Sequence, residues 1–326
     1  MYNVYDTPLG ALNMSGNKQG SGNNNETLPK MYIYGGKQLP YVSGQAFRYY
    51  LRTTMDNMKY VINQLYNIDE QFSKRVYDTV FIESLLSSGK KTDINLQDIR
   101  TFLKYPGLDL FGYMITGEQN YNRQSVLKNS PLLGVYVKYT QDVRSRRKFF
   151  GTKKEDKTSY TFTRLYSAVF YNTLEIELDR LGKFIGPELN INSNEVFTID
   201  NIEFYRKVVI SDVINGIFTL RGGANQSRLL NDISPVFSVI TLTNSVRVPV
   251  NVRPKSSKIV HIDDRVMSKI NKMFKNDKIL LVYDEDYVDT DDRNTRIYSD
   301  VIKNYESVEK YDINEIIKWV TENLDL

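Results

Sequence analysis

The sequence contains no cysteine in its 326 residues, which excludes disulfide bonds, thiolate metal sites and cysteine nucleophiles. It contains a single histidine, His261, so a zinc site with several histidines is excluded and a Ser–His–Asp triad would depend on that residue. His261 lies in the segment IVHIDD, where we expect a structural role. The acidic run DEDYVDTDD lacks the glycine and the final glutamate of a calcium-binding loop. We therefore expect no enzyme activity, no metal and no cofactor.

Long apolar runs are also missing. No stretch approaches the roughly 18 apolar residues that a membrane-spanning helix needs. The N-terminal segment MYNVYDTPLG lacks the basic and apolar regions of a signal peptide. We expect a soluble, cytoplasmic protein without a membrane partner. The net charge of +4 is only mildly basic, so the distribution of the charges is more informative than their sum.

The N-terminal part of the sequence predicts a polar loop, a strand hairpin and a helix. Residues 13–30 are rich in Asn, Gly and Ser, which is typical of a loop. The segment MYIYGGKQLPYV then predicts a strand, a Gly-Gly turn and a short approach to Ser43. Apolar residues follow at helical spacing from Phe47 to Ile62. We therefore predict a helix that is capped by Ser43 and reaches about Asn67.

The rest of the chain mixes helices and strands without the regular alternation of a βαβ series, which favours the α+β class. We predict a mostly helical stretch at 68–105 and further helices near 198–220, 264–275 and 312–323. We predict strands at 107–117, 132–140, 165–178, 236–242 and 279–283. The length and pattern together indicate one core domain with insertions.

Three basic clusters could carry a function, and the first lies on the first predicted helix. Gln45, Arg48 and Arg52 share one face at the start of this helix. A helix N-terminus presents free backbone N–H groups, and phosphate binds well at such an end. The simpler interpretation of each arginine is a solvated or salt-bridged surface residue.

The second cluster is RSRRKFFGTKK at 144–154, where Phe149 and Phe150 follow Arg146 and Arg147. Charges that follow a backbone, together with rings that stack on bases or wedge between them, suit single-stranded nucleic acid. The simpler interpretation is a surface hairpin whose phenylalanines contact a neighbouring element.

The third cluster is RGGANQSR at 221–228, where two glycines lie between basic residues. Glycines let backbone N–H groups approach phosphates closely, and the flanking arginines and amides supply charge and hydrogen bonds. The segment lacks the terminal GK[ST] of a P-loop and the spacing of a dinucleotide fingerprint. The simpler interpretation is a loop that needs positive φ.

Several motifs occur in a recognisable order. LGALN, a Gly-Asn loop and GGKQLPYVSGQAFRYYLR are followed by DLFGYM at 109–114, RQSVLKNSPL at 123–132, YSAVFY at 166–171 and GGANQSRLLNDISPVF at 222–237. This ordered set resembles the CRISPR Cascade backbone subunits, which coat the guide RNA, and in particular the DevR-type branch of type I-B systems. The resemblance covers about residues 1–245.

The resemblance implies an α+β fold with an RRM-like (ferredoxin-like) palm formed by the whole chain, a helical insertion at 68–106 and a protruding β-hairpin thumb at 139–164. It implies a non-catalytic subunit that polymerises along crRNA and presents it for pairing with target DNA in antiviral defence. The implied partners are crRNA, the target DNA strand paired to the guide, other copies of the chain, other Cascade subunits and a recruited nuclease–helicase.

The resemblance also assigns residues to the RNA. Those that would bind it are Asn13, Lys37, Ser43, Gln45, Arg48, Arg52, Met114, Arg221, Gly222, Gly223, Asn225, Gln226 and Arg228. The wedge at the thumb would consist of Arg146, Arg147, Phe149 and Phe150. Contacts with the RNA backbone suit a coat that must accept any guide sequence.

Two other functions remain open. Proteins that resemble this branch were first thought of as developmental autoregulators, so a DNA-binding regulator is one alternative. It is disfavoured because no helix-turn-helix pattern is evident and the net charge of +4 is modest. The other alternative is a backbone subunit that cleaves target RNA, with Asp142 near the thumb as its candidate catalytic residue.

Overall fold

The structure is a computed structural model of the whole chain. It describes residues 1–7, 14–15, 25–89, 94–116, 120–148, 158–223, 232–242, 278–284, 286–287, 305–309 and 311–324. In these ranges no helix is long and apolar enough to span a membrane.

The described strands and helices confirm a mixed α and β architecture. The strands are β1 (Tyr2–Asp6), β2 (Met14–Ser15), β3 (Asn25–Pro29), β4 (Met31–Tyr34), β5 (Lys37–Val42), β6 (Tyr113–Ile115), β7 (Tyr121–Arg123), β8 (Leu127–Asn129), β9 (Leu132–Lys148), β10 (Thr158–Ile176), β11 (Lys183–Ile185), β12 (Val196–Thr198), β13 (Phe237–Leu242), β14 (Lys278–Tyr283) and β15 (Tyr305–Glu309). The helices are α1 (Gly44–Met58), α2 (Tyr60–Tyr66), α3 (Glu70–Ser73), α4 (Val80–Ser87), α5 (Thr101–Lys104), α6 (Pro106–Phe111), the 3-10 helix η1 (Gly186–Leu189), α7 (Ile202–Phe218) and α11 (Ile313–Asn323).

One large sheet organises the chain, with the strand order β15-β14-β13-β1-β10-β9-β5-β4. The first strand, β1, lies in its interior and pairs antiparallel with both β10 and β13. Buried polar side chains fix this register: the Asn3 amide donates to Asn172 at 3.1 Å, and Ser238 donates to Asn3 at 2.7 Å. The innermost strands therefore come from segments that lie far apart in the sequence.

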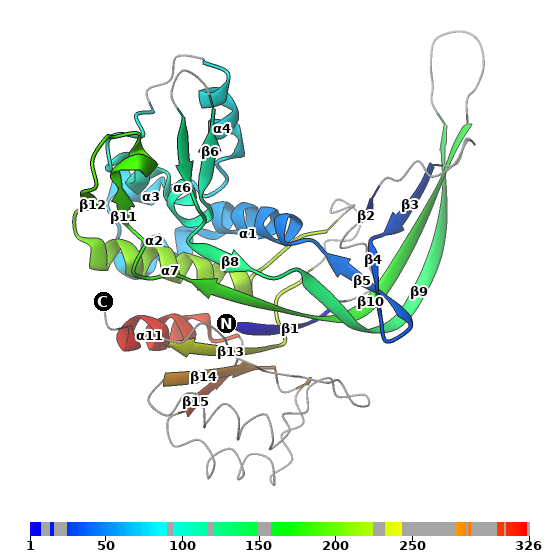
Figure 1. Cartoon of the computed structure of the whole chain (residues 1–326). Coiled ribbons are helices and arrows are strands. Elements are labelled where there is room, and N and C mark those ends of the chain that lie inside the picture. The colour runs from blue at the N-terminus through cyan, green and yellow to red at the C-terminus, as the bar shows by residue number, and fades with distance from the viewer. Residues whose placement is uncertain are drawn as a thin grey trace.

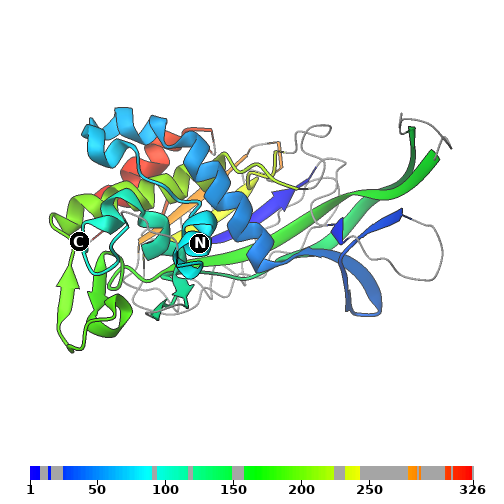
Figure 2. The same cartoon turned by 90° about the horizontal axis from the view of Figure 1, so that it is seen from above.

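Helices α1 and α7 pack together on one face of this sheet (Figures 1 and 2). Helix α7 is buried almost all round, because α1, α2 and α11 pack against it. The two helices approach closely at Gly216, where a Cβ atom would lie 2.6 Å from the Met55 side chain and 3.1 Å from Leu51. This packing fixes α1, and with it the first basic cluster, relative to the sheet.

Strands β9 and β10 form a long hairpin that extends well beyond the sheet (Figure 1). Their inner halves are interior strands of the sheet, so the hairpin is longer than the 139–164 predicted for the thumb. The register shifts between Ser167 and Ala168 and between Val169 and Phe170, close to the point where β10 ceases to pair with β1. Such irregularities bend and twist a strand pair, and here they lie where the hairpin leaves the body.

Several predicted elements are confirmed, and three differ from the prediction. The polar loop predicted at 13–30 contains the strands β2 and β3. The stretch predicted as mostly helical at 68–105 has only the short helices α3, α4 and α5 in its described residues. The Gly-Gly turn, the capped first helix, the strand at 279–283 and the final helix are present. The predicted strand at 107–117 is instead helix α6 followed by the short strand β6. All six residues of α6 are buried, so its apolar residues show no helical period, and Pro106 at its first position is the informative signal. The predicted helix at 264–275 lies outside the described residues.

Candidate nucleic-acid interface

The N-terminus of α1 is built by a side-chain cap. The Ser43 backbone is extended, and its hydroxyl accepts a hydrogen bond from the Ala46 N–H at 3.3 Å. Gln45 is exposed in the first turn, which contains no acidic residue. The positive end of the helix dipole is therefore not neutralised within this turn, which suits an anion.

Arg48 lies one turn further on and is half-buried. Its Nε donates to Asn129 Oδ1 at 2.6 Å, and its Nη2 donates to the Leu127 carbonyl at 2.9 Å. Burial lowers the pKa of Arg48 below its usual value, and the charge of Arg52 lowers it further. Arg48 therefore has a structural role, and the charge that it adds to the N-terminal half of α1 is held in a fixed position.

Arg52 is also partly buried, with 17% of its side chain exposed. Its Nε lies 4.0 Å from Asp78 Oδ1, and its guanidinium lies over the Phe111 ring at 5.5 Å from the centroid. Burial raises the pKa of nearby Glu83, and the charge of Arg52 opposes this shift. The carboxylates of Asp78 and Glu83 thus partly neutralise the charge of Arg52 within the chain.

The start of the third cluster lies against α1. The Arg221 N–H donates to the Thr54 hydroxyl at 3.3 Å. At Gly222 a Cβ atom would lie 2.4 Å from the Tyr50 ring, and Gly223 has a φ of +105°. Both positions therefore require glycine, the first for close approach and the second for its backbone conformation. The structure thus brings the first and third clusters together, as far as the third is described.

Lys37 and Met114 lie on two other hairpins. Lys37 begins β5, is exposed and pairs with Tyr34 across the turn formed by Gly35 and Gly36. Met114 is 71% exposed, whereas its neighbours Tyr113 and Ile115 are 4% and 3% exposed. Figure 1 shows β6 and the long hairpin on the same side of the body, with α1 between them.

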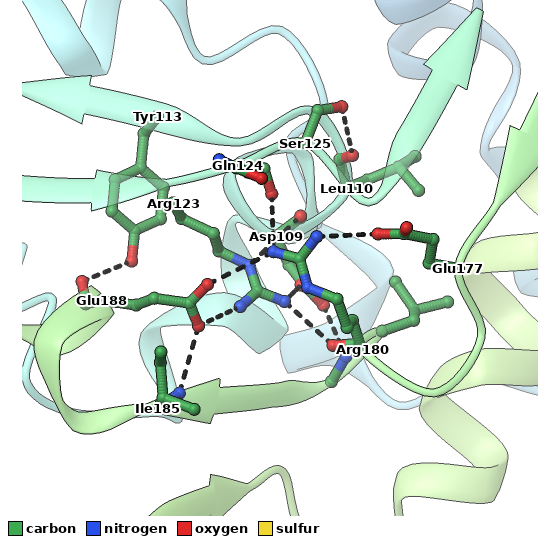
Figure 3. A network of polar contacts seen from close by, with 12 residues as sticks. Asp109, Leu110, Tyr113, Arg123, Gln124, Ser125, Glu177, Arg180, Ile185 and Glu188 are labelled. Carbon is green, nitrogen blue, oxygen red and sulfur yellow. Dashed lines mark hydrogen bonds and ion pairs between the residues drawn. The ribbon is translucent and has the colours of Figure 1, made fainter. Parts of the chain in front are cut away.

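A buried ionic network anchors the hairpin of Met114 (Figure 3). Arg123 donates to Asp109 and to Glu188, each at 2.5 Å, and its guanidinium lies 4.0 Å from the centroid of the Phe184 ring. The other oxygen of Asp109 accepts from the Tyr205 hydroxyl at 2.9 Å. Burial raises the pKa of Asp109, and the charge of Arg123 opposes the shift. Because every partner is buried or nearly so, this network has a structural role.

For several predicted site residues the structure gives no side-chain position. Asn13, Asn225, Gln226, Arg228, Phe149 and Phe150 lie outside the described residues. The backbones of Arg146 and Arg147 belong to the outer part of β9, opposite Tyr160 and Ser159 of β10. Strands β9 and β10 run without a break from this outer part into the sheet. There β9 pairs with β5, the strand that precedes α1.

The sequence interpretation missed the structural partner of Arg48. Asn129 lies 81 positions away in the sequence and belongs to the polar stretch KNS, where no periodicity distinguishes it. It also missed Asp78 and Glu83, because their proximity to Arg52 depends on how α4 packs. Such contacts between distant segments leave no signal in the spacing of one sequence.

Comparison with known proteins identifies the family. Residues 9–266 match the family described as "CRISPR-associated negative auto-regulator DevR/Csa2". The chain belongs to this family, which confirms the resemblance seen in its motifs. No functionally curated protein matches its sequence significantly.

Solved structures show the same fold at low sequence identity. A chain of a "CRISPR RNA-guided surveillance complex" is similar with a TM-score of 0.53 and 11% identity, and the match covers 98% of both chains. A chain of a "CRISPR RNA-guided surveillance complex, pre-nicking" is similar with a TM-score of 0.54, 11% identity and the same coverage of 98%. The fold is thus shared from end to end with chains from such complexes.

Proposed function

We propose that this chain is a non-catalytic backbone subunit of a type I CRISPR effector complex of the Cascade class. It polymerises along crRNA and presents the guide for pairing with target DNA in antiviral defence. The observation that carries the proposal is the similarity in fold to a chain of an RNA-guided surveillance complex over 98% of both chains. Membership of a CRISPR-associated family supports it independently.

The topology supports an RRM-like palm. The elements β1, α1, β9, β10, α7 and β13 follow one another in the βαββαβ order of ferredoxin-like folds, with shorter elements inserted between them. Their strands lie in the sheet order β13-β1-β10-β9, with both helices on one face. In this proposal the outer part of the β9–β10 hairpin is the thumb, and α3, α4 and α5 belong to the helical insertion at 68–106.

The α1 region supports binding to the RNA backbone. A capped helix N-terminus with an exposed glutamine and no acidic residue in its first turn suits phosphate. Arg48 adds positive charge from a fixed position beside it. A guide coat needs contacts of this kind, because it must accept any spacer sequence.

The proposal includes the partners of a Cascade backbone. These are crRNA, further copies of this chain, other Cascade subunits, the target DNA strand paired to the guide and a recruited nuclease–helicase. The descriptions of the similar structures, which name RNA-guided surveillance, support crRNA and the other subunits most directly.

The proposal assigns no catalytic step to the chain. The candidate for RNA cleavage, Asp142, forms a two-pronged ion pair with its cross-strand partner Arg164, at 2.7 Å from Nε and 3.1 Å from Nη2. Both carboxylate oxygens are therefore engaged on the surface of the hairpin. This arrangement supports a role in holding the two strands together rather than in chemistry.

A sequence-specific autoregulator is the second candidate, favoured by the words "negative auto-regulator" in the family description. Binding of the purified chain to two unrelated single-stranded RNAs of equal length and to duplex DNA, across a salt series, separates the two functions. Equal affinities for both RNAs with a steep salt dependence are expected for a guide coat. A strong preference for one sequence or for the duplex would overturn the proposal in favour of the regulator.

A further inference from the structure

The outer face of the β6–β7 hairpin displays a pair of side chains. Met114 is 71% exposed between two buried neighbours. Its cross-strand partner in the register is Asn122, which is also exposed. Cross-strand partners in an antiparallel pair lie on the same face, so Met114 and Asn122 are presented together.

The core holds this face rigidly. Tyr113, which precedes Met114, donates from its hydroxyl to the Glu188 carbonyl at 3.0 Å. Arg123, which follows Asn122, is fully buried in ion pairs with Asp109 and Glu188 (Figure 3). Each residue of the displayed pair is therefore adjacent to a residue that is locked in the core, so the pair is pre-organised for a ligand.

The surroundings of the pair indicate what kind of ligand fits. Besides Met114, the exposed residues of the described hairpin are Thr116, Asn120 and Asn122, all polar and uncharged. The core of a protein–protein interface is instead enriched in apolar and aromatic residues, and here the exposed Val80 and Phe81 lie on α4, not on the hairpin. On the hairpin itself, one apolar side chain among amides and a hydroxyl suits a ribonucleotide, which combines an apolar sugar and base face with phosphate and hydroxyl groups.

We infer that Asn122 is an RNA-contact residue that acts together with Met114. The Asn122 amide donates a hydrogen bond to a phosphate or to a 2′-hydroxyl, and Met114 packs against the adjoining sugar or base. This inference rests on the proposed function and extends it to a residue that neither the sequence motifs nor the family resemblance identified. It also places RNA contact at the β6–β7 hairpin, which is separated from the long hairpin by α1 (Figure 1).

A photo-crosslinking amino acid placed at position 122 tests the inference with full-length protein and a labelled single-stranded RNA. The matched control carries the same probe at position 196, because Val196 is 58% exposed on β12, a hairpin strand distant from α1 in Figure 1. The expected result is a crosslink to RNA from position 122 and not from position 196. A crosslink from position 122 to a second copy of the chain would overturn the inference in favour of a protein contact.

Substitutions at the same position give a second readout. Loss of one hydrogen bond predicts that Asn122→Ala weakens RNA binding about three- to tenfold, and Asn122→Asp weakens it further because its charge repels phosphate. Normal RNA binding by both variants would overturn the inference while the proposed function stands. Failure of the wild-type chain to bind RNA would instead overturn the proposed function, and this inference with it.

Discussion

Arg48 donates from Nε to Asn129 Oδ1 at 2.6 Å and so ties helix α1 to strand β8. A residue predicted to contact guide phosphate is therefore also part of the scaffold. Substituting Arg48 and Asn129 in separate variants distinguishes the contact of Arg48 with RNA from its structural role.

We predict that Arg48→Ala weakens RNA binding by about 1.5 kcal/mol or more, which is about tenfold, because a charged phosphate contact is lost. Asn129→Ala removes the structural partner but leaves the charge, so it lowers the free energy of unfolding by about 1 kcal/mol with little effect on RNA affinity. Urea denaturation and fluorescence anisotropy measure the two quantities. Equal RNA affinities for the two variants would assign Arg48 a structural role alone.

Gln45→Glu is expected to weaken RNA binding without lowering the stability of the protein. An acidic residue in the first turn of a helix stabilises it by about 0.3–1 kcal/mol, and this turn of α1 has none. The same charge repels phosphate at the helix N-terminus. We therefore expect an unchanged or higher melting temperature together with weaker RNA binding. RNA binding as tight as that of the wild type would show that this helix end does not hold phosphate.

Asp78→Asn is predicted to strengthen RNA binding. Asp78 lies 4.0 Å from Arg52 and compensates its charge, so neutralising Asp78 leaves Arg52 freer to attract phosphate. We expect a gain in affinity of about two- to fivefold at low salt that diminishes at high salt, because salt screens the attraction between Arg52 and phosphate. An Asp98→Asn variant changes the net charge equally at a distant exposed pair. An equal gain in both variants would point to net charge rather than to Arg52.

The sequence predicts local structure well where one face of an element is buried. The stripe from Phe47 to Met55 and the cap at Ser43 define α1, because only the buried face of this helix is apolar. The Gly-Gly turn follows from the chemistry of the residues, since Gly35 and Gly36 both have positive φ. Helix α6 was not predicted, because full burial removes the alternation between apolar and polar positions.

Contacts between distant segments could not be predicted from spacing. Arg75 forms a buried ion pair with Asp212, 137 positions away, and Arg123 forms another with Asp109. A charged residue in a sequence gives no sign that it is buried, because most arginines remain at the surface. The same limit applies to the site: the residues of the first and third clusters are visible in the sequence, but their meeting at Tyr50 depends on the packing of α1.

The Arg123 network is predicted to contribute strongly to stability. Asp109→Asn leaves the buried guanidinium without one of its two carboxylates, and breaking a buried pair in this way costs about 3–5 kcal/mol. Lys74→Ala breaks the exposed Lys74–Glu70 pair and should cost about 0–1 kcal/mol. Urea denaturation of both variants measures the difference. Similar small losses would show that the Arg123 pair contributes little to the fold.

The last prediction concerns Phe149 and Phe150, which lie outside the described residues and follow the end of β9 in the sequence. The paired strands are described as far as Lys148 and Thr158, at the outer end of the hairpin. If the rings contact RNA bases and the next subunit, replacing both by Ala should spare folding. It should also reduce coating of long RNA more than binding of a short strand, because a short strand seats one subunit. Aromatic stacking is worth roughly 1–3 kcal/mol per base, so the loss should be measurable.

Melting temperature, short-strand affinity and filament length, compared between the wild type and the double variant, test this prediction. A Tyr139→Ala variant is the matched control, because Tyr139 is 49% exposed on the same strand β9 and pairs with Ser167, nearer to the body of the molecule than the outer pair Lys148 and Thr158. We expect full-length filaments from the control and shorter filaments from the double variant at the same melting temperature. A large drop in the melting temperature of the double variant with unchanged filaments would place the rings in the core, and their role as a wedge between bases would then be wrong.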